Sequence, residues 1–182
     1  MANFPVPTRS DVAPTNQAIF DQLKDTLGFV PNLYATFAYS ETALADYLAL
    51  QNRTSSLRAR EREAINLTVS QVNECAYCLA AHTVLGKMNG FTEDQILELR
   101  GGTASFDAKL NALVTFVRAT TETHGRPDPA LVDAFLAAGY TKENLVDVLV
   151  VIGDKIVSNY LHGITQIPVD FPAAPELEPT VA

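Results

Sequence analysis

Apolar residues recur along most of this chain with the period of an α-helix, and proline and glycine interrupt them at intervals that suit helices of roughly three to five turns. The segment 15–27, for example, places Phe20, Leu23 and Leu27 on one stripe, and Gly28 follows where a helix would end. The pattern predicts an all-α, single-domain fold. We expect helices over 15–27, 31–38, 40–50, 55–72, 74–88, 92–99, 106–122 and 129–138, with a last long helix from 141.

The chain of 182 residues is long enough to bury a hydrophobic core, and it contains no obvious internal repeat, low-complexity block or interdomain linker. We therefore predict one domain over 1–182. Its parts are an N-terminal arm (1–14), N-terminal helices (15–54), a core that carries the cysteine motif (55–166) and a proline-rich C-terminal tail (167–182). The prolines of this tail predict extended backbone.

The net charge of −8 argues against a nucleic acid or an anionic membrane surface as a partner, because both require a basic face on the protein. The N-terminal residues lack the charged and apolar regions of a signal peptide, so we expect a cytoplasmic protein. In a reducing compartment, a close pair of cysteines is more often catalytic, redox-sensing or metal-binding than a permanent structural disulfide.

The segment Leu145–Ile152 of the last predicted helix is apolar around almost its whole circumference. This pattern predicts burial on several sides, in the core or between subunits. Asp147, Asp154 and Lys155 interrupt the apolar region well before the roughly 18 to 20 residues that a membrane-spanning helix needs. We therefore expect no membrane span.

Both cysteines of the chain lie close together, at Cys75 and Cys78, and His82 follows one helical turn later. In a helix over 74–88, the three side chains project to one face, because Cys78 and His82 are an i, i+4 pair and Cys75 and His82 an i, i+7 pair. Asn73 is the predicted N-cap, which puts Cys75 in the first turn, where free N–H groups and the helix dipole favour a thiolate. Since only the thiolate attacks a peroxide or a disulfide, the spacing predicts a reactive dithiol.

Glu63 can join these residues only if the chain turns sharply before the cysteines. In one straight helix its Cα would lie about 18 Å from that of Cys75 along the axis, at 1.5 Å per residue. A turn near Gln71 to Glu74 would instead fold two helices against each other as a helix-turn-helix corner. We predict this corner.

Two other interpretations of the cysteines remain open from the residues alone. In one, they are small buried hydrophobic residues. In the other, the pair and His82 supply three ligands to zinc, although a fourth ligand would have to come from His124 or His162, far along the chain. Covalent haem is excluded because Leu79 rather than histidine follows Cys78. We expect no metal and no cofactor.

The motif Glu63-x11-Cys75-x2-Cys78-x3-His82 resembles the signature of the alkyl hydroperoxidase D family, within the carboxymuconolactone decarboxylase-like superfamily. The segments 28–33 and 159–172 are similar to the branch described as peroxidase-related enzymes. The resemblance implies an all-α fold, assembly into trimers or hexamers, and thiol-dependent reduction of hydroperoxides without a prosthetic group.

The resemblance also implies roles for single residues and a partner. The glutamate and the histidine that match Glu63 and His82 belong to a proton relay that activates the cysteine pair. The reducing equivalents come from a dithiol partner, such as a lipoyl or thioredoxin-like protein. One position departs from many members, because Tyr77 stands between the cysteines in place of a histidine. Its phenol, with an ordinary pKa of about 10, cannot act as a base at neutral pH but can donate a hydrogen bond.

The residues suggest a mechanism as a hypothesis. We expect His82 to accept a proton from a neighbouring thiol while Glu63 orients the imidazole and stabilises its charged form. We favour Cys78 as the attacking sulfur, because it lies one turn from His82, and Cys75 as the resolving one, although the helix-terminal position favours a low pKa at Cys75 instead. A sulfenic acid and then a disulfide would follow. A thiol–disulfide oxidoreductase or redox sensor with little peroxidase activity, and a non-redox decarboxylase-like protein, are the alternatives.

Overall fold

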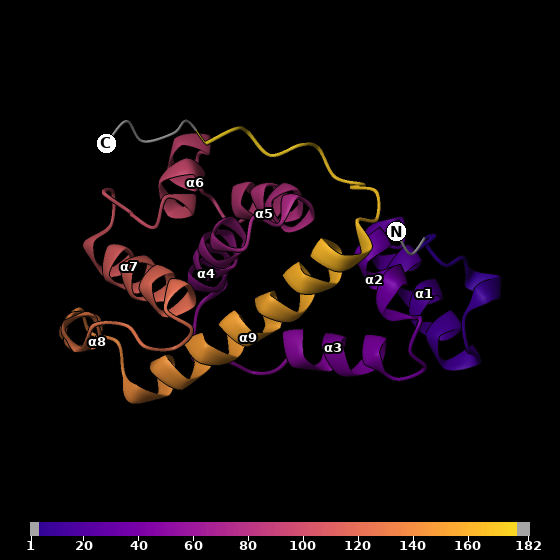
Figure 1. Ribbon diagram of the computed structural model, residues 1–182, viewed down its shortest axis with the longest axis horizontal. Helices are drawn as coiled ribbons and strands as arrows, with labels where there is room; N and C mark the ends of the chain where they lie inside the picture. Colours follow the sequence, from indigo (N-terminus) through magenta and orange to yellow (C-terminus); the bar gives the residue numbers. More distant parts are fainter. Residues whose placement is uncertain (1–3, 178–182) are drawn as a thin grey trace.

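The computed structural model describes residues 4–177 (Figure 1). These residues form α-helices and one short 3₁₀ helix and contain no strand, which confirms the predicted all-α fold. Every α-helix in this part of the chain overlaps a predicted range. In chain order the elements are η1 (Arg9–Asp11), α1 (Pro14–Leu27), α2 (Asn32–Phe37), α3 (Ala43–Gln51), α4 (Ala59–Val72), α5 (Ala76–Met88), α6 (Glu93–Arg100), α7 (Ala108–Glu122), α8 (Pro129–Ala137) and α9 (Lys142–Thr165).

Helix α4 lies at the centre of the molecule and packs against α5, α6, α7 and α9. Its residues 64–70 are all buried, and Ala64, Ile65 and Leu67 are fully inaccessible to solvent. They join buried side chains of α6, α7, α8 and α9 in the larger of two apolar clusters. Burial of one large apolar side chain contributes roughly 1.5–3 kcal/mol. This cluster therefore fixes the position of α4 and with it the backbone of Glu63.

A second apolar cluster joins the N-terminal helices to α5. Phe20 of α1 and Leu44 of α3 pack there together with Cys75, Tyr77 and Cys78. In Figure 1, α1 and α2 occupy one end of the molecule, α7 and α8 occupy the other, and α9 runs between them. The cysteine motif therefore lies at the seam between the two clusters.

The chain turns between α4 and α5 through Asn73 and Glu74. The N–H of Glu74 donates to the carbonyl of Gln71 at 3.1 Å, and the N–H of Cys75 donates to the carbonyl of Ser70 at 3.0 Å. This pair of bonds defines a Schellman motif. Glu74 has a φ of 52°, in the left-handed region that glycine usually fills and that costs another residue roughly 1–2 kcal/mol. The predicted corner is confirmed.

The N-cap of α5 is Cys75 and not Asn73, so this part of the prediction was wrong. Cys75 is extended, with φ −83° and ψ 96°, and its Sγ accepts a hydrogen bond from the N–H of Cys78 at 3.3 Å. Asn73 ends α4 as its C-cap, and its side-chain amide donates to Oδ1 of Asn159 on α9 at 2.9 Å. The physical reason is that the Schellman motif uses both Asn73 and Glu74 before the next helix begins.

Helix α4 begins at Ala59, later than the predicted start at 55, because Asp147 of α9 binds the preceding residues. Its carboxylate accepts hydrogen bonds from Ser55 Oγ at 3.1 Å, from the N–H and Oγ of Ser56 at 2.6 and 2.7 Å, and from Arg53 at 2.6 Å. Burial alone would raise the pKa of Asp147, but these bonds hold it far below its ordinary value. The two serines therefore form a turn facing α9.

The tail after α9 runs past α5 toward α6 without regular secondary structure, in keeping with its prolines (Figure 1). Asp170 accepts hydrogen bonds from the N–H of Asn32 at 2.8 Å and from the hydroxyl of Tyr77 at 2.6 Å. Further along, Arg100 donates to the carbonyl of Pro175 at 2.6 Å. Residues 1–3 of the predicted arm and 178–182 of the predicted tail lie outside the described residues.

Helix α9 is the longest helix of the described chain, with 24 residues. Val148 and Ile152 of its apolar segment are buried in the core, whereas Val146 and Leu149 face solvent. The sequence predicts burial of this segment on several sides. In the single chain, only one face of the helix is buried. Within residues 4–177, no helix combines the length and the apolar character needed to cross a membrane.

Candidate active site

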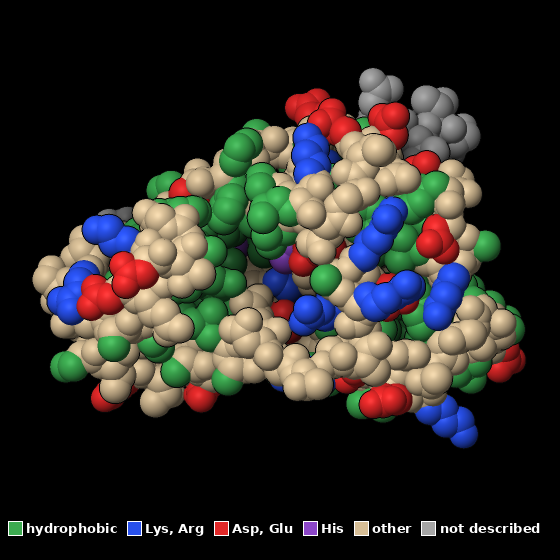
Figure 2. All heavy atoms as spheres, turned by 180° about the vertical axis from the view of Figure 1, so that it is seen from behind, with side chains coloured by type: hydrophobic (Ala, Val, Ile, Leu, Met, Phe, Trp, Pro, Cys, Tyr) green, Lys and Arg blue, Asp and Glu red, His purple; other side chains and the backbone are tan. Residues whose placement is uncertain are grey.

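A cavity of about 520 Å³ opens at the seam between the two apolar clusters, lined by α3, α4, α5, α9, the segment around α2 and the tail. Most of its lining side chains are apolar or aromatic. Figure 2 shows the hollow, with hydrophobic side chains on its walls and basic and histidine side chains deep inside it. A concave, mostly apolar site with a few convergent polar groups is the usual form of a small-molecule site.

The two cysteines differ in their access to this cavity. Cys78 forms part of its wall, whereas Cys75 is not among the described residues that line it. Both side chains are buried, at 2% exposed for Cys78 and 3% for Cys75. Sγ of Cys78 lies 4.0 Å from Oγ of Ser158 on α9. A small molecule in the cavity would therefore meet the sulfur of Cys78 first.

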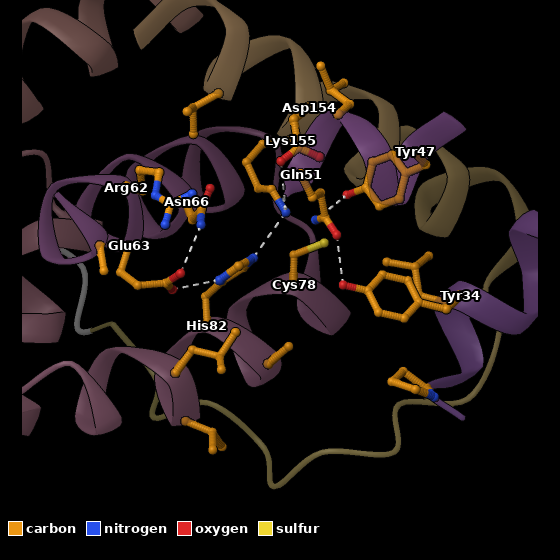
Figure 3. Close-up of a pocket in the computed structure, with 18 of the residues that line it drawn as sticks. Tyr34, Tyr47, Gln51, Arg62, Glu63, Asn66, Cys78, His82, Asp154 and Lys155 are labelled. Carbon is orange, nitrogen blue, oxygen red and sulfur yellow. Dashed lines mark hydrogen bonds and ion pairs between the residues drawn. The ribbon is translucent and has the colours of Figure 1, made fainter. Parts of the chain in front are cut away.

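Three helices place a row of polar side chains beside Cys78 (Figure 3). Oε2 of Glu63, from α4, lies 2.8 Å from Nδ1 of His82, from α5. Nε2 of the same ring lies 3.1 Å from Nζ of Lys155, from α9. The corner between α4 and α5 thus brings Glu63 into contact with His82. Within residues 4–177, no hydrogen bond joins His82 to either sulfur, because Lys155 binds the nitrogen that faces away from Glu63.

The two partners of His82 determine where its proton lies. An ammonium group can only donate, so Nε2 of His82 accepts a hydrogen bond from Lys155. In the neutral ring the hydrogen is therefore on Nδ1, which donates to Glu63. The amide of Asn66 donates to the other oxygen of Glu63 at 3.1 Å. Burial alone would raise the pKa of Glu63, but His82, Lys155 and Asn66 together hold it below its ordinary value.

The pKa values of the two cysteines shift in opposite directions. The hydrogen bond from Cys75 lowers the pKa of Cys78 to about 5, against the effect of burial and with help from the charge of Lys155. The same hydrogen bond raises the pKa of Cys75, and burial adds to the effect. The site therefore favours a Cys78 thiolate beside a Cys75 thiol. This is opposite to the low pKa that the helix-terminal position of Cys75 suggests, because burial and the partner sulfur outweigh the helix dipole.

Lys155 is the functional residue that sequence reasoning missed. The sequence argument used it only to interrupt a membrane span, yet its side chain is among the most buried polar groups of the described chain, at 2% exposed. Its Nζ also lies 3.9 Å from Oδ2 of Asp154. A signal was present, because charged side chains are almost never fully buried without a partner, and Lys155 follows the apolar segment Leu145–Ile152 of the same helix.

A second set of polar groups lies on the other side of Cys78 (Figure 3). The hydroxyl of Tyr34 donates to Oε1 of Gln51 at 2.8 Å, and Nε2 of Gln51 donates to the hydroxyl of Tyr47 at 3.0 Å. Burial raises the pKa of both phenols, so they stay neutral. They therefore add hydroxyl groups, and no charge, to the wall of the cavity.

Tyr77 contacts the tail and α2 through its hydroxyl. The group donates to Asp170 at 2.6 Å, as a hydrogen-bond donor was expected to do, and it accepts from the N–H of Leu33 at 3.2 Å. Burial raises the pKa of Tyr77, with Asp170 acting in the same direction. The ring of Tyr77 lines the cavity and stacks at a tilt on His162, with ring centroids 5.5 Å apart.

The residues considered as zinc ligands do not form a metal site. His124 is exposed in a loop, with a φ of 55°, and His162 packs against Tyr77. In the part of the chain that the structure describes, no group of three or more His, Cys, Asp and Glu side chains is arranged to hold a metal ion.

Comparisons with known proteins agree with this geometry. Residues 39–122, which include Glu63, Cys75, Cys78 and His82, match the carboxymuconolactone decarboxylase family (CMD). A peroxidase-related protein from Silicibacter sp. TM1040 shares the fold with a TM-score of 0.78 and 24% identity, over 90% of this chain and 88% of that one. A protein from Ralstonia eutropha JMP134, described as an alkylhydroperoxidase AhpD core and peroxidase-related, has a TM-score of 0.80 and 20% identity, over 92% of both chains. Residues 39–122 are thus similar to the carboxymuconolactone decarboxylase family, and the chain shares its fold with proteins described as peroxidase-related.

The same fold also occurs in a protein described as a debrominase. The debrominase Bmp8, in a cysteine-to-alanine variant bound to 2,3,4-tribromopyrrole, has a TM-score of 0.75 and 17% identity, over 92% of both chains. At these identities the likeness to the solved structures shows a shared fold alone. No curated protein matches the chain.

Proposed function

We propose that this protein is a thiol-dependent peroxidase that reduces organic hydroperoxides through a Cys75/Cys78 dithiol–disulfide cycle. The observation that carries the proposal is the position of Cys78, on the wall of the cavity with a pKa of about 5. Cys75, hydrogen-bonded to it, keeps its proton. The fold shared with peroxidase-related proteins supports the proposal.

The first step breaks the O–O bond of the peroxide. The Cys78 thiolate attacks the terminal oxygen of R–O–OH, which forms Cys78–SOH and releases RO⁻. The alkoxide takes up one proton and leaves as the alcohol. Lys155, which is hydrogen-bonded to Nε2 of His82, supplies this proton, while Glu63 holds the imidazole in the tautomer that accepts from Lys155. Sulfur is oxidised by two electrons and the peroxide is reduced by two.

The second step forms the disulfide and restores the site. Cys75 attacks the sulfur of the Cys78 sulfenic acid and the hydroxyl group leaves as water, with the proton taken from the Cys75 thiol. A dithiol then attacks the Cys78 sulfur, which lines the cavity, and itself becomes a disulfide. The burial of both sulfurs favours a small peroxide over a protein disulfide as substrate, because a folded protein cannot reach them without opening the site. It likewise favours a slender lipoyl arm over a thioredoxin-like protein as reductant.

The proposal is tested by peroxide consumption with dihydrolipoamide, dithiothreitol or thioredoxin as the donor. Turnover of cumene hydroperoxide with a dithiol supports it. Reversible formation of a Cys75–Cys78 disulfide without turnover by any donor would leave a thiol–disulfide oxidoreductase or redox sensor in its place. Because a debrominase shares the fold, 2,3,4-tribromopyrrole is the comparison substrate. Faster conversion of this compound than of any hydroperoxide would also contradict the peroxidase.

Glu63→Gln should slow the reaction of Cys78 with hydroperoxide roughly 10²-fold, the lower range for a disabled acid–base group. An amide can donate to Nδ1 of His82, which would move the ring hydrogen to Nε2 and set it against the ammonium of Lys155. Stopped-flow measurement of sulfenic acid formation would report the rate. The control is Glu93→Gln, which removes a carboxylate from an exposed ion pair with Lys87. Wild-type rates in Glu63→Gln would remove Glu63 from the mechanism.

The outer face of α9 supports assembly into a homo-oligomer, as the resemblance implied. We name its exposed apolar side chains the α9 outer stripe, and they are Val146, Leu149, Val157, Tyr160 and Ile164. Their spacing is that of one helix face, and Ile164 is 72% exposed. Scattered apolar residues on a surface are ordinary, but a continuous stripe marks an interface.

Val157→Asp combined with Ile164→Asp should weaken self-association by about 10²-fold or more in dissociation constant, since each apolar side chain contributes roughly 1.5–3 kcal/mol when buried. Sedimentation velocity over a range of concentrations measures this. Ala134→Asp places the same charge on the exposed face of α8 and should leave the assembly intact. A wild-type protein that stays monomeric at every concentration would rule out the interface.

A further inference from the structure

Arg62 lines the cavity one residue before Glu63, and its charge has no partner among the described residues. Its Nε is buried without a hydrogen bond, and within residues 4–177 no hydrogen bond or ion pair reaches the guanidinium. Most other arginines of this part of the chain do have such a partner, namely Arg9, Arg53, Arg58, Arg100 and Arg118. A buried donor left unsatisfied is unfavourable, because it loses its hydrogen bonds to water without replacement. A ligand that supplies an acceptor to Arg62 would recover this energy.

The way the charges of the cavity are paired leaves one cation for an anion. Arg53, Arg62 and Lys155 line it, beside the carboxylates of Glu63 and Asp154 and the thiolate of Cys78. Arg53 and Lys155 already contact Asp147 and His82, respectively. Arg62 is therefore the cation that remains available, and its planar fork suits a carboxylate, which it can bind through two parallel hydrogen bonds.

The edge of the cavity favours an apolar body on the same molecule. We name this edge the apolar rim, and its exposed lining residues are Leu27, Phe29, Leu50, Leu85 and Met88. Met88 is 78% exposed. Figure 2 shows hydrophobic side chains gathered around the hollow. A ligand that covers this rim removes apolar surface from water and is stabilised by the hydrophobic effect.

We propose that the site takes an amphipathic carboxylic acid: the carboxylate binds Arg62, the hydrocarbon part lies against the apolar rim, and the reacting group meets Cys78. The substrate is then a hydroperoxide that carries an acid group, and this reading of the reacting group rests on the proposed peroxidase function. The acid subsite itself depends only on Arg62 and the cavity.

Equilibrium binding tests the acid subsite without any turnover. Isothermal titration calorimetry of octanoate and octanamide, which differ in the acid group alone, should show tighter binding of octanoate to the wild-type protein. Arg62→Gln should weaken octanoate binding by about tenfold or more, to the level of octanamide. The octanoate affinity of Arg62→Lys should lie between those of the wild type and Arg62→Gln, because lysine keeps the charge but lacks the planar fork of arginine. Circular dichroism confirms that each variant is folded.

Arg60→Gln is the matched control. It removes the same charge from the same helix, but the Arg60 side chain is exposed and lies over the ring of Phe91, with its Cζ 4.3 Å from the ring centroid. Its octanoate affinity should equal that of the wild type. Equal affinity of the wild type for octanoate and octanamide would overturn the acid subsite. An equal loss of octanoate affinity in Arg62→Gln and Arg60→Gln would also overturn it.

Kinetics separates the two proposals. The two substrates are a fatty hydroperoxide that bears an acid group and the neutral cumene hydroperoxide. Arg62→Gln should raise the KM of the acid-bearing substrate relative to that of cumene hydroperoxide, in proportion to the loss of octanoate binding. If octanoate binding depends on Arg62 and no hydroperoxide is turned over, the peroxidase function fails and the acid subsite stands. If hydroperoxides are turned over and octanoate binding ignores Arg62, the acid subsite fails alone.

Discussion

Replacing Cys78 by serine is expected to abolish hydroperoxide turnover, with a loss of about 10³-fold or more, because a serine hydroxyl at this position has no base that could ionise it. Cys78 is the sulfur that lines the cavity, and its thiolate is stabilised by Cys75 and Lys155. Peroxide consumption with a dithiol donor measures the loss. No sulfenic acid should be trapped in this variant by a dimedone-type reagent.

Cys75→Ser is the matched variant, because it removes the other sulfur of the pair. It should react once with peroxide and stop as a Cys78 sulfenic acid, since no second thiol is available to form the disulfide. Its thiolate should form less readily, because the hydrogen bond from Cys75 is the main cause of the low pKa of Cys78. A sulfenic acid on Cys75 in the Cys78→Ser protein would reverse the assignment of the two cysteines.

Lys155→Met should move the midpoint of the pH–rate profile upward by about 1–3 pH units, the range for the loss of a nearby opposite charge. The pKa of Cys78 is lowered to about 5, so the reactive thiolate is present above that pH and is lost as pH falls through it. Without the ammonium the pKa rises, and activity is lost at a higher pH on the way down. At pH 6 the rate should fall by up to about 100-fold.

The pH dependence of Lys155→Met can be followed by rate and by thiolate absorbance in the ultraviolet. Lys142→Met is the control, because Lys142 is exposed at the start of the same helix. Methionine is apolar and close to lysine in length, so the buried position can accept it. A midpoint identical to that of the wild type would show that the charge of Lys155 does not act on Cys78.

The sequence was sufficient for the all-α fold, because helical periodicity and the prolines and glycines that interrupt it are local signals. It was also sufficient for the corner that brings Glu63 to His82, although the residue in the left-handed position is Glu74 and not the glycine that would have marked the turn. The predicted N-cap of α5 was wrong for the same reason. A Schellman motif without glycine leaves no clear trace in one sequence, so the local pattern predicts Asn73 as the N-cap of the next helix, whereas it is the C-cap of α4.

The remaining parts of the site depend on contacts between residues far apart in the chain. Lys155 reaches His82 across 73 positions, and Asn159 of the same helix accepts from Asn73 across 86. No local pattern encodes such pairs, because they depend on how α9 crosses α4 and α5. The low pKa of Cys78 has a local and a long-range cause. The hydrogen bond from Cys75 contributes most to it, and the charge of Lys155, which no local pattern predicts, adds to it.

The seam between the two apolar clusters also determines how a reagent from solvent can reach the thiols. Cys75 and Cys78 belong to the smaller cluster, with α1 to α3, whereas the centre of α4 belongs to the larger one. Parts of a folded protein open locally at free energies below that of global unfolding. Displacement of α1 to α3 would expose the sulfur of Cys75, which does not line the cavity, while α4 and its neighbours stay folded. The rate at which an alkylating reagent modifies Cys75 is therefore set by the local stability of the N-terminal helices and not by that of the whole chain.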